Sequence, residues 1–192
     1  SKGQVESGDK DEQRGVTQCD TNGDYTDMPA RIGEGIPQAA VTSDVIVGFC
    51  GETNAEVGLT LDLVKTLRFK NSFIFKYSPR PGTKAFDRQP DDVPEAVKKE
   101  RNRLLLEAQA EVSLAGNRRF IGSRQQVLVE GLSTRDEKRA VDPGLDGIAQ
   151  LTGRTMCDRI VVFDAPLRLV GRLVDVEITA AGAWSLAGEV AD

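Results

Sequence analysis

The sequence contains no histidine and only three cysteines, Cys19, Cys50 and Cys157. Histidines and closely spaced cysteines are the usual protein ligands of zinc and of iron–sulfur clusters. These three cysteines are too scattered to bind a cluster alone, so a metal site would need ligands from elsewhere. Their irregular spacing does not indicate a disulfide framework either, which favours a reducing cytoplasmic location.

Long apolar runs are also missing. No segment approaches the roughly 20 apolar residues that are needed to cross a membrane. The polar start of the chain lacks the apolar core of a secretory leader. We therefore expect a cytoplasmic protein without a membrane partner.

Aromatic residues make up only 5% of the chain, whereas 39% of its residues are hydrophobic. The core is therefore expected to consist mainly of valine, leucine, isoleucine and alanine. The net charge of −5 weakly disfavours non-specific binding of nucleic acid, but residues 61–103 hold eleven basic residues against six acidic ones. A basic surface can thus form locally in an acidic chain.

The start of the chain predicts little regular structure. Most of it is polar and rich in glycine and aspartate, and prolines and glycines interrupt the short helical pattern of Arg31–Pro37. We expect residues 1–37 to be a poorly ordered segment. Two domains are expected to follow, over 38–116 and 117–190.

Residues 38–116 show the order strand, helix, strand, helix. Val41–Phe49 is apolar and rich in β-branched residues, as expected of a strand that is covered on both faces. Thr53 and Glu56 predict a capping box at the start of a helix. The expected apolar face of this helix consists of leucines four residues apart: Leu59, Leu63 and Leu67.

The second strand is predicted at Ser72–Tyr77, and Pro79 and Pro81 stiffen the loop that follows it. The second helix is predicted to begin after an N-cap at Asp92 and to end at Gly116. Successive βα units of this kind place their strand ends around a ligand crevice.

Residues 117–190 are predicted to form a small closed β-barrel of the OB type, because short β-type runs alternate with glycine and aspartate turns. These runs are Gln126–Glu130, Leu151–Thr155, Arg159–Phe163, Arg172–Ile178 and Ala183–Val190. The charged stretch Ser133–Ala149 is expected to be a long, mobile loop.

Two strand-end segments are candidates for ligand binding. In the turn Gly48–Glu52, glycines allow a close approach of the backbone, while the acidic Glu52 disfavours a phosphate and suits hydroxyls or an amine. In the loop Lys76–Lys84, two prolines would hold Arg80 toward a phosphate or a carboxylate. Purely structural turns are the alternative for both segments. For the arginines of the barrel, composition alone favours solvated faces.

Several of these motifs resemble those of the radical S-adenosylmethionine (SAM) methylthiotransferases. In the first domain the matching segments are Ser43–Thr53 (SDVIVGFCGET), Phe75–Thr83 (FKYSPRPGT) and Asp92–Pro94. Leu151–Thr155 and Asp158–Phe163 resemble the TRAM barrel, the RNA-binding domain that closes these enzymes. The loop Ser-Pro-Arg-Pro-Gly-Thr is similar to the MiaB-type branch, which methylthiolates N6-isopentenyladenosine 37 of tRNA.

The resemblance, which covers residues 38–190, implies an α/β fold in which this chain supplies the C-terminal β-α-β-α portion of a partial (β/α) radical SAM barrel, followed by the TRAM barrel. SAM would lie over the strand ends. The residues that the resemblance places at this cofactor are Ile46, Gly48, Gly51, Glu52, Tyr77 and Ser78. Those that it places at the tRNA, whose anticodon stem-loop would be the partner, are Lys76, Arg80, Arg154 and Arg159.

The resemblance is incomplete. The family binds a [4Fe–4S] cluster through Cys-x3-Cys-x2-Cys and carries further cysteines in an N-terminal domain, and this sequence lacks both features. Without these thiolates no cluster can deliver the electron that cleaves the cofactor. We therefore expect an incomplete portion of the enzyme that does not catalyse alone and has the missing N-terminal half as a partner. The alternatives are a tRNA-binding module without chemistry, and an inactive remnant that exposes faces which missing neighbours would cover.

Overall fold

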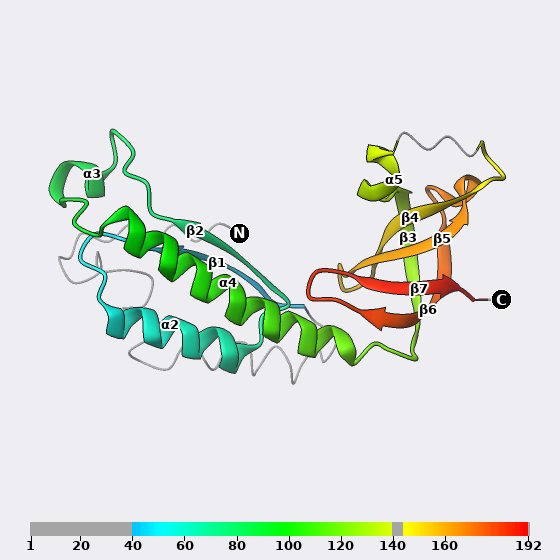
Figure 1. Ribbon diagram of the computed structural model, residues 1–192, viewed down its shortest axis with the longest axis horizontal. Helices are drawn as coiled ribbons and strands as arrows, with labels where there is room; N and C mark the ends of the chain where they lie inside the picture. The colour runs from blue at the N-terminus through cyan, green and yellow to red at the C-terminus, as the bar shows by residue number, and fades with distance from the viewer. Residues whose placement is uncertain (1–39, 140–143, 192) are drawn as a thin grey trace. The chain divides into compact units, whose positions relative to one another are not determined.

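The computed structural model describes residues 40–139 and 144–191, and Figure 1 shows their helices and strands. The chain divides into two compact units, one ending at Gln109 and the other beginning at Ala110. This boundary lies inside one long helix, so the last turns of that helix belong to the second unit. The predictions for residues 1–37 lie outside the described residues.

The first unit is built on a two-stranded parallel sheet. β1 (Thr42–Val47) and β2 (Asn71–Lys76) pair along their whole length, and α2 (Asn54–Leu67) connects them. α3 (Lys84–Arg88) and α4 (Glu95–Arg118) follow. This order confirms the predicted β-α-β-α portion, to which the structure adds the short α3.

Helix α4 covers one face of this sheet. The Ser72 hydroxyl donates to Gln109 Oε1 (2.7 Å), and Asn102 Nδ2 donates to the carbonyl of Ile74 (3.1 Å). The other face carries three half-exposed apolar side chains, Ile46, Phe73 and Phe75. The prediction of a strand covered on both faces is therefore wrong for β1, since half of its sheet surface stays open in the part of the chain that the structure describes.

The capping box at the start of α2 is confirmed. The Thr53 hydroxyl accepts a hydrogen bond from Glu56 N, and the Glu56 carboxylate accepts one from Thr53 N (2.7 Å). The predicted leucine face is wrong at Leu59, which is 62% exposed, whereas Val57 and Val64 are buried. Val57 and Val64 lie two turns apart on one side, and the step of about 100° per residue turns Leu59 to the opposite side.

Helix α4 continues two residues beyond its predicted end at Gly116. The next residue, Asn117, is buried, and its Nδ2 donates to the carbonyl oxygens of Gly182 (2.8 Å) and Ala183 (3.2 Å). These bonds join residues that are distant in sequence, and they hold the last turn of the helix in place. The local sequence shows the glycine but not these partners.

The second unit is a closed β-barrel with the strand order β3-β4-β5-β7-β6. Its strands are β3 (Arg124–Leu132), β4 (Ile148–Thr155), β5 (Ile160–Pro166), β6 (Leu173–Ala181) and β7 (Leu186–Val190). β5 and β7 pair in parallel, and the other neighbours pair antiparallel. The barrel confirms the OB-like fold that the short runs predict.

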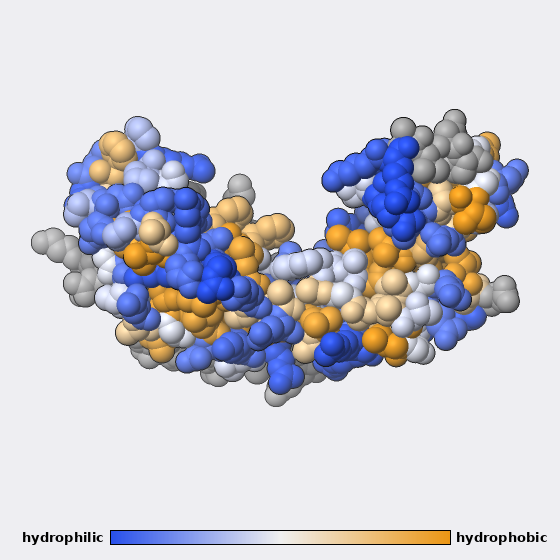
Figure 2. Space-filling view, viewed as in Figure 1, coloured by the Kyte–Doolittle hydropathy of each residue, from blue (hydrophilic) through white to orange (hydrophobic). Residues whose placement is uncertain are grey.

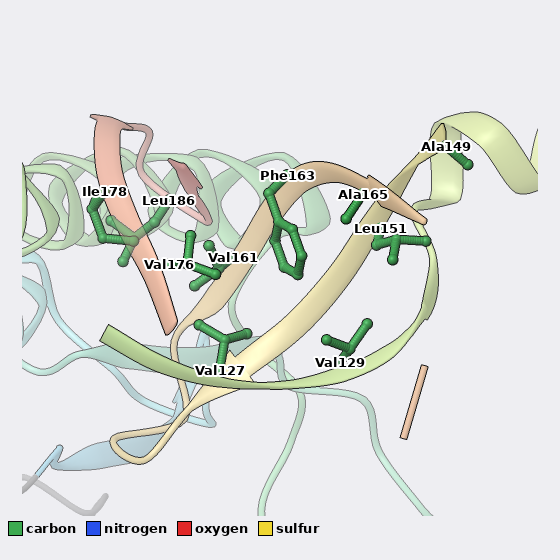
Figure 3. Packing of buried hydrophobic residues seen from close by; sticks show 10 residues of the cluster. All are labelled: Val127, Val129, Ala149, Leu151, Val161, Phe163, Ala165, Val176, Ile178 and Leu186. Atoms are coloured by element: carbon green, nitrogen blue, oxygen red, sulfur yellow. The ribbon is translucent and has the colours of Figure 1, made fainter. Parts of the chain in front are cut away.

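The barrel core is aliphatic apart from Phe163, as the composition predicts (Figure 3). Alternate residues of each strand point inward, which is the period of two expected of a strand with one buried face. The buried cluster consists of Val127, Val129, Ala149, Leu151, Val161, Phe163, Ala165, Val176, Ile178 and Leu186. A short 3-10 helix, Leu167–Leu169, follows β5.

Part of the predicted loop Ser133–Ala149 is regular. α5 (Thr134–Lys138) begins after Ser133, whose hydroxyl accepts a hydrogen bond from Asp136 N (3.3 Å). The strand β4 already starts at Ile148. The loop prediction is therefore wrong at both ends of this stretch, and its central residues 140–143 lie outside the described ranges.

The buried carboxylate of Asp136 fastens α5 to β4. Its Oδ2 accepts from Gln150 N (2.9 Å) and its Oδ1 from Arg135 Nε (3.1 Å). The Gln150 N–H first, and then Arg135, lower the pKa of Asp136. A carboxyl whose pKa is lowered by folding stabilises the fold above its unfolded pKa, and this contribution disappears as the pH falls through the folded pKa.

We therefore expect Asp136→Asn to lower the urea midpoint of the barrel at pH 7, and the difference from the native chain to shrink as the pH is lowered to 3. Urea curves followed by far-UV circular dichroism at both pH values measure it. Glu137→Gln, at the exposed neighbouring position, is the control. An equal difference at the two pH values would contradict the assignment.

Candidate functional site

The turn after β1 is held by carboxylates of the chain itself. Gly48 and Gly51 have positive φ angles of 74° and 76°, which favour glycine. Gly48 N donates to Glu52 Oε2 (2.6 Å), and Gly51 N donates to Asp92 Oδ1 (2.7 Å). Because both N–H groups are occupied, the turn offers neither of them to a phosphate. This agrees with the expectation that Glu52 disfavours a phosphate cradle.

Glu52 is also fixed from the opposite side by Arg101 of α4. Arg101 Nη1 donates to Glu52 Oε2 (2.7 Å) and to the Glu52 carbonyl (3.1 Å), while Nη2 donates to Asn54 Oδ1 (3.0 Å). The two side chains are only 9% and 14% exposed. Glu52 therefore joins the turn, the start of α2 and the middle of α4.

A second buried cation, Lys98, lies one turn before Arg101 on α4. Its ammonium group pairs with Asp91, donates to the Tyr77 carbonyl (3.4 Å) and lies 5.2 Å from the centre of the Tyr77 ring. Its stem packs under Gly48, where an added Cβ would lie only 2.4 Å from Lys98 Cγ. Position 48 thus requires glycine, both because its φ angle is positive and because Lys98 approaches it so closely.

Sequence reasoning missed both cations of α4. A signal was present, because Lys98 and Arg101 share the helical spacing of the buried Leu105 and Ala108. Charged residues on the buried stripe of a helix are rare unless they are paired. Their partners, however, lie in distant loops that the local pattern does not reveal.

The end of β2 places Tyr77 beside the turn. Its ring meets Phe49 edge to face, with centroids 4.8 Å apart. Burial raises the pKa of Tyr77, as do its hydrogen bond to the Cys50 thiol and the charge of Asp91. Tyr77 is therefore a neutral phenol at physiological pH. The next residue, Ser78, is exposed.

The two predicted cations near this strand end differ in whether an acidic side chain already pairs with them. Lys76 forms an ion pair with Glu95, whose pKa it lowers. Arg80 is exposed, and no acidic group pairs with it among residues 40–139 and 144–191. Gly48 packs on the stem of Lys98, and the Lys98 ammonium group lies beside the Tyr77 ring. The turn that contains Gly48 and Gly51 therefore lies next to Tyr77, where the loop that contains Arg80 begins. Ile46 instead lies on the open face of the sheet, opposite Phe75 in the pairing.

The two predicted arginines of the barrel are both engaged. Arg154, 43% exposed, donates to Glu130 Oε1 (3.1 Å) and Asp158 Oδ1 (2.6 Å), and Asp158 contributes most to raising its pKa. Apolar side chains reach the barrel surface (Figure 2). Two of them, Leu128 and Ile160, are paired with Arg154 across the neighbouring strands.

Arg159 supports the end of α4. Its Nη1 donates to Asn117 Oδ1, and its guanidinium lies 4.6 Å from the centre of the Phe120 ring. Its Nε is buried without an acceptor in the described part of the chain. Arg159 is thus half buried between other side chains, whereas Arg154 keeps an exposed surface.

A [4Fe–4S] cluster does not fit the residues that the structure describes. Within them, no group of three or more cysteine, histidine, aspartate or glutamate side chains is placed to hold a metal ion. Cys50 and Cys157 are free thiols and lie in different units. Nor does any helix of the described residues have the length and apolarity to span a membrane.

The comparison with known families identifies the barrel. Residues 118–191 match the TRAM domain family, so the second unit is a TRAM barrel.

Most of the chain also matches longer proteins. It is 47% identical over 170 residues to the tRNA-2-methylthio-N(6)-dimethylallyladenosine synthase of Rhodopirellula baltica. This match covers 88% of this chain and 35% of that protein. Proteins of the same name from Acetivibrio thermocellus and Moorella thermoacetica are both 42% identical over 88% of this chain, which spans 33% and 35% of their lengths. Over most of its length the chain is homologous to one part of these synthases, and it spans about a third of the length of the relatives that it matches.

These matches are longer than the motifs suggested. They cover 88% of the chain, whereas the resemblance in the sequence was confined to residues 38–190. The similarity therefore includes residues before position 38, which lie outside the range that the motifs cover.

Proposed function

We propose that this chain is a C-terminal portion of a tRNA methylthiotransferase that acts on N6-isopentenyladenosine 37 in the anticodon stem-loop. The main support is its 47% identity, over 88% of its residues, to a protein named for this modification. The cluster thiolates of such an enzyme would come from outside the described residues.

The first unit would contribute one wall of the SAM site. An adenine ring fits an exposed apolar surface such as that of Ile46 and Phe75, which are 52% and 55% exposed on adjacent strands. The turn beside it is held rigid by Glu52, and Tyr77 closes the end of β2 as a neutral phenol. We assign Ile46 to direct contact, and Glu52 to the positioning of the turn through Arg101.

The second unit and the basic loop would bind the tRNA. Among the predicted RNA-binding residues, Arg80 is exposed and has no acidic partner within the described parts of the chain, so we take its charge to be available to a phosphate. Lys76 and Arg154 must exchange an acidic partner for the phosphate, and Arg159 is held by Asn117 and Phe120. We therefore assign Arg80 the largest direct contribution of the four.

This assignment predicts the salt dependence of binding. Each phosphate contact releases counterions, so Arg80→Ala should weaken binding and reduce the slope of log K against log salt concentration by about 1. Fluorescence anisotropy of a labelled anticodon stem-loop at several KCl concentrations measures both quantities. Arg103→Ala is the matched control, because Arg103 is also exposed but pairs with Glu100 and Glu107. Binding that does not depend on salt would remove phosphate contacts from the proposal.

The catalytic part of the proposal needs the rest of the enzyme. Joining this chain to those residues of the Rhodopirellula baltica protein that it does not match should give a protein that binds iron and methylthiolates tRNA, as detected by mass spectrometry of nucleosides. The isolated chain is expected to bind tRNA without iron. A joined protein that assembles the cluster but does not modify tRNA would leave the non-catalytic tRNA-binding module as the function of this chain.

A further inference from the structure

The single tryptophan of the chain has no role in the barrel core. Trp184 lies in the turn between β6 and β7 and is 55% exposed, outside the buried cluster of Figure 3. A tryptophan combines a large, rigid apolar face with a polar N–H, and it is enriched at surfaces that bind partners.

The backbone on both sides of the indole is held in place. Gly182 N donates to the Ser185 carbonyl (2.8 Å), which closes the turn. Asn117 Nδ2 binds the carbonyls of Gly182 and Ala183, and Asn117 itself is only 4% exposed. The hairpin therefore ends beside the last turn of α4 (Figure 1). A platform whose backbone is already fixed loses little entropy when a ligand covers it.

The surroundings of this turn favour an anionic ligand. Arg118 and Arg119 directly follow Asn117, are exposed, and have no acidic partner in the described ranges of the chain. The hairpin from Thr179 to Gly188 contains no acidic residue. Proteins that bind single-stranded nucleic acid combine exposed aromatic rings, which stack on bases, with cations that contact the phosphates.

We propose that Trp184 is a stacking platform for an unpaired base of the RNA that the barrel binds, with Arg118 and Arg119 at the flanking phosphates. The proposal rests on the proposed function, because it takes tRNA as the ligand and adds a contact to it. The stacked base would lie in a loop or at an unpaired end of the RNA, since a base within a duplex has no free face to stack.

The tryptophan itself reports the contact. Because it is the only one in the chain, titration of the full chain with the anticodon stem-loop should quench its fluorescence and protect it from acrylamide. The midpoint should match that from anisotropy. Heparin, a polyanion without bases, should compete for binding without protecting the indole.

Two variants separate stacking from a structural role. Trp184→Ala should weaken binding roughly tenfold, while Trp184→Phe, which keeps an aromatic face, should retain most of the affinity. Thermal melts should be unchanged in both, because the side chain is exposed. Arg118→Ala combined with Arg119→Ala should reduce the salt slope by about 2.

The outcomes distinguish the two proposals. If anisotropy detects no binding of the stem-loop, the proposed function and the stacking contact both fail. If the stem-loop binds without quenching the tryptophan fluorescence of the native chain, and Trp184→Ala binds as tightly as the native chain, the proposed function stands and the stacking contact is overturned. Equal losses in Trp184→Ala and Trp184→Phe would also overturn stacking.

Discussion

Replacing Gly153 with alanine is expected to unfold the barrel. Gly153 lies inside β4, where an added Cβ would stand 2.4 Å from the Leu128 carbonyl oxygen and 2.6 Å from Val127 Cγ1. The oxygen belongs to the backbone of the paired strand β3, so it cannot move without breaking the ladder that closes the barrel. Overpacking of a core usually costs about 1–3 kcal/mol. A clash with backbone should reach or exceed the upper end of this range, a large fraction of the stability of a small domain.

The intrinsic fluorescence of Trp184 measures this effect, because the only tryptophan lies in the barrel and not in the first unit. Urea titration should show a much lower midpoint for Gly153→Ala, or no transition. Gly131→Ala is the matched control, since Gly131 lies on β3 of the same barrel and an added Cβ would have nothing within 4 Å. Equal midpoints for the two variants would show that the strands can separate enough to accept the methyl group.

Features that depend on neighbouring residues could be predicted from the sequence. The capping box of Thr53 and Glu56 is one, because both partners lie within one helical turn. The alternation of inward and outward residues in the barrel strands is another. The TRAM motif Leu151–Thr155 also lies within a single strand, β4, that the structure contains.

Features that depend on distant residues could not be predicted. α4 passes Gly116 because Asn117 binds carbonyls of a hairpin more than 60 residues later in the chain. Glu52 was expected beside a ligand, but its carboxylate is held by Arg101, 49 residues away. The open face of β1 was missed for a related reason, since an apolar strand has the same sequence whether or not the element that would cover its second face is present.

A large loss of stability is also expected when the buried ion pair of Arg101 and Glu52 is broken. Arg101→Met should destabilise the first unit by about 3–5 kcal/mol, because it leaves the carboxylate of Glu52 buried without its cation. Hydrogen exchange of the amides of residues 48–54 should increase most, since Gly48 N and the turn depend on Glu52. The exchange of barrel amides should not change.

Two further variants test whether the unpaired charge is the cause. Arg103→Met is the control, because Arg103 lies on the same helix but its ion pairs with Glu100 and Glu107 are exposed. Exposed ion pairs contribute little to stability. The hydrogen exchange of residues 48–54 should therefore stay at the native level in this variant. Combining Arg101→Met with Glu52→Gln removes both charges, and a buried neutral amide is far less costly than a single buried carboxylate. The double variant should therefore be more stable than Arg101→Met alone. If it is less stable, Arg101 acts through its packing and its bond to Asn54, and the turn after β1 does not depend on the charge of Glu52.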